Sequence, residues 1–235
     1  MESQIRTYPI WIARDGFIKS DEIVPNLNIQ KFLVQKDWAK AQESVIEYAK
    51  INDKFYKKEY FLGILSFNLG DYKEAIKHIE SYIASNSTED KLNVSEVRDM
   101  YNAYVESIYN QADTEKFKKT AEAVLSDIKG IESKNKDLQV FKDLSERINY
   151  LLVEVLHGEN NAKGETVATS FIKTYEKSMY LMRVKYLLGK TLVNTKKEEA
   201  RKIFDEILNN ASTPTYLKEL VKAELTTMEL NKQSI

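Results

Sequence analysis

The feature that most constrains the fold of this chain is a similarity of the sequence to itself at a spacing of 34 residues. When the sequence is shifted by 34 positions, Asp37-Trp38 falls on Asp71-Tyr72 and Ala41 falls on Ala75. The same shift brings further apolar residues together: Leu33 with Phe67, Val45 with Ile79, Tyr48 with Tyr82 and Ala49 with Ile83. Fixed periods of roughly 20 to 50 residues indicate supersecondary units that stack on one another. We therefore expect an array of repeated units.

The clearest unit, residues 60–83, breaks at Gly70-Asp71-Tyr72 and then resumes its helical pattern. Glycine supplies a positive φ at little steric cost, so Gly70 is expected to end the first helix. Asp71 is expected to cap the next helix by accepting a hydrogen bond from an unpaired backbone N–H. Gly63 lets the second helix approach closely, and Ala75 is small where the two helices cross. The sequence therefore predicts a helical hairpin.

Helices are predicted along most of the chain, which has only three prolines, Pro9, Pro25 and Pro214. Amphipathic segments follow one another from residue 26 to residue 212, separated by short polar breaks, with no comparable run of strict alternation. Short breaks between long helices favour antiparallel neighbours. We expect an all-α repeat domain over 26–212 and a capping helix and tail over 213–235. Residues 1–25 are interpreted as an extended segment, with a short hairpin or the end of an upstream domain as alternatives.

These motifs resemble the tetratricopeptide repeat (TPR) family, whose consensus spacing is matched by Leu62, Gly63, Gly70, Asp71, Tyr72 and Ala75. A second copy has a turn one residue shorter and carries Leu188-Gly189, Ala200, Phe204 and Pro214. The repeat around Trp38 is partial, and those at residues 101–125 and 136–175 are degenerate. The resemblance implies an all-α, right-handed superhelical solenoid of antiparallel helical hairpins.

The stretch "ATSFIKTYEKSMYLMRVKYLLGKTL" resembles an inter-repeat signature of bacterial envelope TPR proteins, the BamD-type lipoproteins and the Tol–Pal coordinators. Glu176 stands where those families have proline. The matching positions are Phe171, Tyr175, Ser178, Tyr180, Leu188 and Gly189. The resemblance implies a periplasmic or other extracytoplasmic setting in an outer-membrane, secretion or flagellar assembly. No cysteine is present for lipidation, and the first residues lack the pattern of a signal peptide, so a cytoplasmic setting is the alternative.

Composition and motifs argue against several other classes of function. Lys+Arg at 35 and Asp+Glu at 36 nearly cancel, which disfavours a nucleic-acid binder. No glycine-rich phosphate loop, nucleophile elbow or paired His-Glu zinc motif occurs. Of the two histidines, His78 is expected at a solvated position and His157 near a helix C-terminus. We expect no enzyme activity, no cofactor and no metal site.

The resemblance also implies a binding surface, because the first helices of stacked hairpins line a concave face. The Lys/Asn clamp with which some TPR proteins hold a carboxylate is absent. We expect a scaffold or adaptor that binds a protein or peptide, or else a cytoplasmic peptide-responsive regulator or chaperone. The predicted contact residues are Lys57, Tyr60, Ile64 and Asn68 in the best repeat, Arg183, Tyr186, Lys190 and Asn194 in the last one, and Asn102 and Tyr109 between them.

Overall fold

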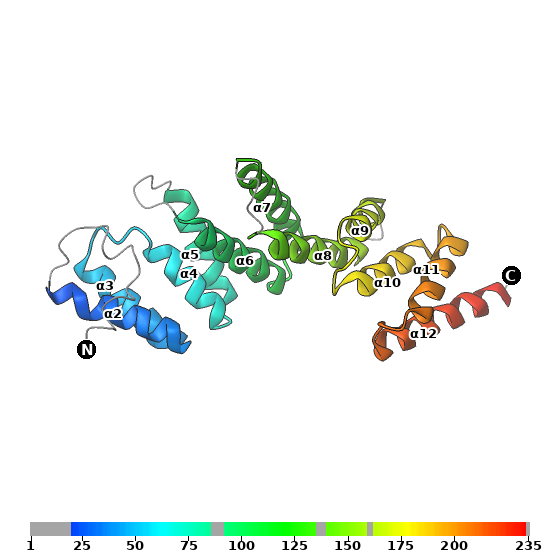
Figure 1. Cartoon of the computed structure of the whole chain (residues 1–235), viewed down its shortest axis with the longest axis horizontal. Helices are drawn as coiled ribbons and strands as arrows, with labels where there is room; N and C mark the ends of the chain where they lie inside the picture. The colour runs from blue at the N-terminus through cyan, green and yellow to red at the C-terminus, as the bar shows by residue number, and fades with distance from the viewer. Residues whose placement is uncertain (1–19, 86–91, 135–139, 159–161, 234–235) are drawn as a thin grey trace. The chain divides into compact units, whose positions relative to one another are not determined.

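The computed structural model describes residues 20–85, 92–134, 140–158 and 162–233, and all regular secondary structure in these ranges is helical (Figure 1). This confirms the all-α prediction for the described residues. The chain divides into two compact units, Met1–Ala112 and Asp113–Ile235, where a single repeat domain was expected. Residues 1–19, which make up most of the expected extended segment, lie outside the described residues.

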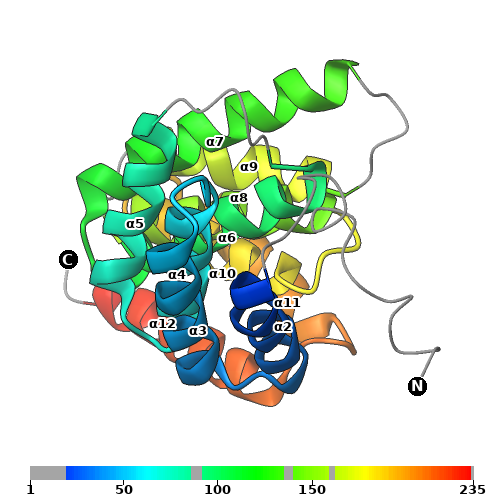
Figure 2. The same cartoon turned by 90° about the vertical axis from the view of Figure 1, so that its left-hand side faces the viewer.

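The described helices of the first unit are α2 (Ser20–Gln35), α3 (Trp38–Ile51), α4 (Lys58–Asn68), α5 (Tyr72–Ser85) and α6 (Val94–Asn110). Each of α3, α4 and α5 packs on the helix before it, and α6 packs on both α4 and α5 (Figure 2). Helix α2 begins at Ser20 and contains Pro25, so residues 20–25, which we expected to be extended, are helical.

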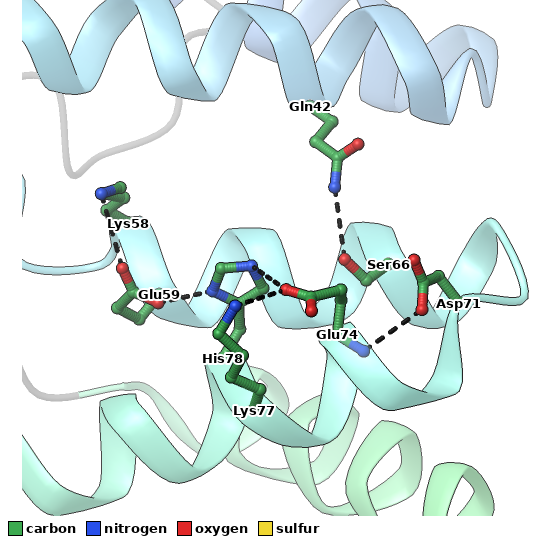
Figure 3. Close-up of polar contacts among 8 residues, drawn as sticks. All are labelled: Gln42, Lys58, Glu59, Ser66, Asp71, Glu74, Lys77 and His78. Atoms are coloured by element: carbon green, nitrogen blue, oxygen red, sulfur yellow. Dashed lines mark hydrogen bonds and ion pairs between the residues drawn. The ribbon is translucent and has the colours of Figure 1, made fainter. Parts of the chain in front are cut away.

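The same turn joins helices at three places in the chain. A residue with positive φ ends the preceding helix at Lys36 (56°), Gly70 (79°) and Ala112 (56°). The following aspartate accepts a hydrogen bond from the backbone N–H three residues later, at 3.3 Å for Asp37, 3.2 Å for Asp71 and 3.0 Å for Asp113 (Figure 3 shows Asp71 with Glu74). The structure thus confirms the predicted turn at Gly70-Asp71 and gives the same turn at Ala112-Asp113, within the degenerate repeat at residues 101–125.

Close packing within two hairpins depends on a glycine in the first helix. A Cβ atom added to Gly63 on α4 would lie 2.6 Å from Cγ1 of Ile79 on α5. A Cβ atom added to Gly189 would lie 2.4 Å from Cε1 of Phe204. Ile79 and Phe204 are both fully buried, so neither side chain can move into solvent. These two hairpins correspond to the two repeats that match the consensus best in the sequence, the ones that contain Gly63 and Gly189.

The second unit contains α7 (Thr114–Lys134), α8 (Lys142–Gly158), α9 (Ala162–Thr174), α10 (Leu181–Leu192), α11 (Lys197–Asn209) and α12 (Thr215–Gln233). Consecutive helices pack on each other, and in addition α8 packs on α10 and α10 packs on α12. Helices α8, α10 and α12 therefore lie next to one another as the first helices of successive hairpins. Among the described residues, no helix is long and apolar enough to cross a membrane.

Candidate functional site

In the first unit, two of the predicted contact residues are buried in packing against α6. Lys57 is only 8% exposed, and its Nζ lies 3.1 Å from each carboxylate oxygen of Glu96. Tyr60 is 6% exposed, and its burial beside Glu96 and Asp99 raises the pKa of its phenol well above the usual range. Their positions relative to the TPR consensus predicted that both residues would lie on an open surface. In the structure, α6 covers them.

The other predicted contact residues of the first unit are more accessible. Asn68 is exposed, and its Nδ2 donates to the backbone oxygen of Ile64 at 2.8 Å, which uses one of its two donors. Ile64 itself is partly buried against the core of this unit. Asn102 and Tyr109 on α6 are partly buried. Their role in binding stays a prediction.

In the second unit, the structure brings three predicted contact residues together on α10. The Arg183 guanidinium and the Lys190 ammonium lie 5.5 and 5.8 Å from the ring centroid of Tyr186, within the range of cation–π contacts. The Tyr186 hydroxyl donates to Glu224 on α12 at 3.2 Å, and Lys190 pairs with the same carboxylate at 3.0 Å. The Tyr186 ring is buried, whereas the Arg183 and Lys190 side chains are 34% and 36% exposed. Asn194 is exposed just beyond the end of α10.

A second layer of the same kind lies on α8 beside α10. The rings of Tyr150 and Tyr180 stack at 4.2 Å with an interplanar angle of 13°, and the Arg147 guanidinium lies 5.5 and 5.7 Å from their centroids. The Tyr150 hydroxyl donates to Glu154 at 2.6 Å, and Glu154 is 3.6 Å from the Nε atom of Arg183. The two layers are therefore joined through Glu154.

The sequence contains a signal for these layers that our sequence analysis missed. Arg147 and Tyr150 are three residues apart, as are Arg183 and Tyr186, and the two Arg-x-x-Tyr pairs are 36 residues apart. Each tyrosine is followed four residues later by a charged residue on the same helical face. We call this surface the α8–α10–α12 face. It consists of Arg147, Tyr150, Glu154, His157, Tyr180, Arg183, Tyr186, Lys190 and Glu224.

His157, in the last turn of α8, lies among the charged groups of this face. Its Nδ1 atom lies 3.1 Å from the hydroxyl of Thr191 on α10. Burial, and then the positive charges of Lys190 and Arg183, lower the pKa of the imidazole below 6.5, and the charge of Glu224 opposes this shift only in part. At His157, the charges of Lys190 and Arg183 therefore act in the same direction as burial and disfavour the protonated imidazole.

His78 is not at the solvated position that we expected. Its side chain is 19% exposed, and its Nδ1 atom lies 2.6 Å from Glu59 of α4, while Nε2 lies 3.7 Å from Glu74 (Figure 3). The close crossing of α4 and α5 brings Glu59 against His78, so these contacts join the two helices of the hairpin. Over the described ranges, no three His, Asp or Glu side chains are arranged to hold a metal ion.

Comparisons with known proteins give one similar structure. No family model matches the chain. None of the curated proteins matches it either. A solved structure of a thermophilic TPR protein from Thermus thermophilus is similar, with 19% sequence identity and a TM-score of 0.39. The alignment covers 87% of this chain and 99% of that one.

Proposed function

We propose that this chain is a non-enzymatic interaction scaffold or adaptor, and that its α8–α10–α12 face binds an extended segment of a partner protein. The observation that carries the proposal is the repeated layer of a tyrosine with neighbouring cations and a carboxylate, present on α8 and again on α10. Successive helices with the same side-chain layer suit a ligand that runs across them. A peptide presents its polar groups at a regular spacing and fits such a surface.

The charged groups of this face are suited to exchanging partners. The contact between Arg183 and Glu154 is long at 3.6 Å, and both side chains are partly exposed. Surface ion pairs contribute only about 0–1 kcal/mol each, so a ligand can replace one partner at small cost. The tyrosine rings hold the cations in place before binding, which reduces the entropy lost when a ligand is bound.

The proposed setting is a bacterial envelope assembly. It rests on the resemblance of residues 171–189 to the inter-repeat signature of envelope proteins. Cell fractionation of the natural host provides the test, with recovery in the periplasmic or membrane fraction as the expected result. Recovery in the cytoplasm alone would favour a peptide-responsive regulator or chaperone that uses the same face.

The binding proposal is tested with linear peptides selected from a random display library on the whole chain. Their dissociation constants are measured for the wild type, for Arg183→Ala with Lys190→Ala, and for Lys163→Ala with Lys196→Ala as a control of equal charge. The control lysines pair with Glu122 and Glu165, away from the proposed face. Hydrogen bonds to charged groups contribute roughly 1.5–3 kcal/mol, so the first variant should weaken binding at least about tenfold and the control less than about twofold.

Two results would refute this proposal. One is that no linear peptide is enriched by the whole chain. The other is that the Arg183 and Lys190 variant binds the selected peptides as well as the wild type, while its helicity by circular dichroism is unchanged.

A further inference from the structure

Arg183, in the first turn of α10, has hydrogen-bond donors that the carboxylate beside it does not satisfy. Its Nε atom lies 3.6 Å from the Glu154 carboxylate, which is longer than a hydrogen bond between nitrogen and oxygen. A guanidinium carries five N–H donors and no acceptor, and the Arg183 side chain is 34% exposed. The group therefore has donors to offer to a ligand that reaches the α8–α10–α12 face.

Lys190, two turns further along α10, is engaged differently. Its ammonium pairs with Glu224 at 3.0 Å, and the hydrogen bond with that carboxylate raises the pKa of Lys190 above its ordinary value. A cation that already holds a carboxylate at hydrogen-bond distance gains less from a second one. Of these two cations of α10, Arg183 is therefore the more open to a new carboxylate.

The position of Arg183 is supported by Tyr186. The guanidinium lies 5.5 Å from the centroid of the tyrosine ring, which is itself buried and held by the hydrogen bond from its hydroxyl to Glu224. A guanidinium over a ring still presents the N–H donors at its edge, in a fork that matches the two oxygens of a carboxylate. Because the ring restricts the side chain before binding, less entropy is lost when a ligand is bound.

Glu154 does not depend on Arg183 for a hydrogen-bond donor. Its carboxylate accepts a hydrogen bond from the Tyr150 hydroxyl at 2.6 Å, within α8. This hydrogen bond remains when Arg183 turns to a ligand, so the exchange leaves Glu154 with a donor. An anionic ligand would still meet the negative charge of Glu154, and like charges that face each other oppose binding.

We propose that Arg183 is a specificity-determining residue of the α8–α10–α12 face, and that it binds the side-chain carboxylate of an aspartate or glutamate within the partner segment. Two N–H donors of the guanidinium hold the two oxygens, and the ligand takes the place of Glu154 beside Arg183. The carboxylate comes from an internal side chain, because the proposed ligand runs across successive helices. This inference rests on the proposed function and adds the chemical group that the face selects.

A double-mutant cycle tests this pairing with display-selected peptides that are amidated at the C-terminus. Each acidic residue of a peptide is changed to its amide, and dissociation constants are measured for the wild type and for Arg183→Gln. At one acidic position, the change should weaken binding to the wild type at least about tenfold and binding to Arg183→Gln less than about twofold. Lys163→Gln, which removes one positive charge away from the face, is the control and should behave as the wild type does.

Arg183→Lys separates the fork from the charge. It keeps the positive charge but loses the two parallel donors, so it should bind the acidic peptide at least about threefold more weakly than the wild type. Affinity equal to that of the wild type would contradict the two-donor contact.

Glu154→Gln tests the exchange of partners. Removal of the negative charge beside Arg183 should tighten the binding of acidic peptides about threefold, whereas Glu122→Gln, a control of equal charge that pairs with Lys163, should leave it unchanged. Unchanged or weaker binding by Glu154→Gln would contradict the exchange.

Three results would overturn the inference while the proposed function stands, because peptides still bind in each. They are selected peptides without an acidic residue, equal losses for the wild type and Arg183→Gln, and binding only by peptides with a free C-terminal carboxylate. If the whole chain enriches no linear peptide, the proposed function itself fails, and the inference fails with it.

Discussion

Replacing Gly189 by alanine tests whether the crossing of α10 and α11 holds the second unit together. The added Cβ atom would lie 2.4 Å from Cε1 of Phe204 and 3.0 Å from both Cδ1 and Cζ. Phe204 is fully buried, and the ring of Tyr186 packs against it with centroids 6.3 Å apart. The phenyl ring therefore has no solvent to move into, and the helices themselves must separate.

The size of the effect follows from two opposing contributions. Alanine is favoured over glycine in a helix by about 1 kcal/mol. Overpacking a core costs about 1–3 kcal/mol, and we take the upper end because the ring is enclosed. The expected net loss is about 2 kcal/mol. Gly130→Ala on α7 is the matched control in the same unit, since among the described residues its added Cβ meets no atom within 4 Å outside its own stretch of helix backbone, and it should gain about 1 kcal/mol.

Urea unfolding monitored by circular dichroism measures both variants against the wild type. The urea concentration at the midpoint should fall for Gly189→Ala and rise for Gly130→Ala. The slope of the free energy of unfolding against urea concentration should stay unchanged in both variants. The difference between the two variants is expected to be about 3 kcal/mol. A Gly189→Ala protein as stable as the wild type would show that the helices are not in close contact at this crossing.

Two further predictions concern single side chains. Ser107→Ala should raise the free energy of unfolding by about 1 kcal/mol, because the buried Ser107 hydroxyl has no hydrogen-bond partner among the described residues. Ser66→Ala should lower the free energy of unfolding, since Ser66 accepts a hydrogen bond from Gln42, and equal effects of the two changes in urea unfolding would contradict this. The folded-state pKa of His157 is lowered below 6.5, so its contribution to stability is present above pH 6.5 and is lost as the pH falls through the folded value. His157→Gln should therefore flatten the fall in stability between about pH 7 and pH 5, and an unchanged profile would refute the reasoning.

The sequence was informative where a feature depends on neighbours along the chain. The turn at Gly70-Asp71 and the close approach at Gly63 follow from a glycine and a cap at fixed spacing, so the 34-residue shift was enough to find them. The turn at Ala112 lies within the degenerate repeat at residues 101–125, and its position was harder to predict, because it comes 42 residues after Gly70, beyond a longer loop, and because alanine gives no signal for a positive φ.

Features that depend on contacts between distant helices were harder to predict. The position of Lys57 and Tyr60 within the repeat predicted that they would lie on an open face. Their position alone does not reveal that α6 brings Glu96 over them. The contact of His78 with Glu59 likewise joins two helices and follows from their crossing distance. The Arg-x-x-Tyr pairs, by contrast, were present in the sequence. A third pair, Arg98 and Tyr101, lies on α6, and only the pairs at 147 and 183 are followed four residues later by a charged residue.

The central claim is that a peptide binds along the α8–α10–α12 face, and photo-cross-linking with mass spectrometry tests it most directly. A display-selected peptide that carries a photoreactive side chain is bound to the whole chain, irradiated and digested. The account predicts adducts on α8 and α10, near Tyr150, Arg183 and Lys190, that are lost in the Arg183 and Lys190 variant. Adducts confined to α9, α11 or the first unit would contradict it.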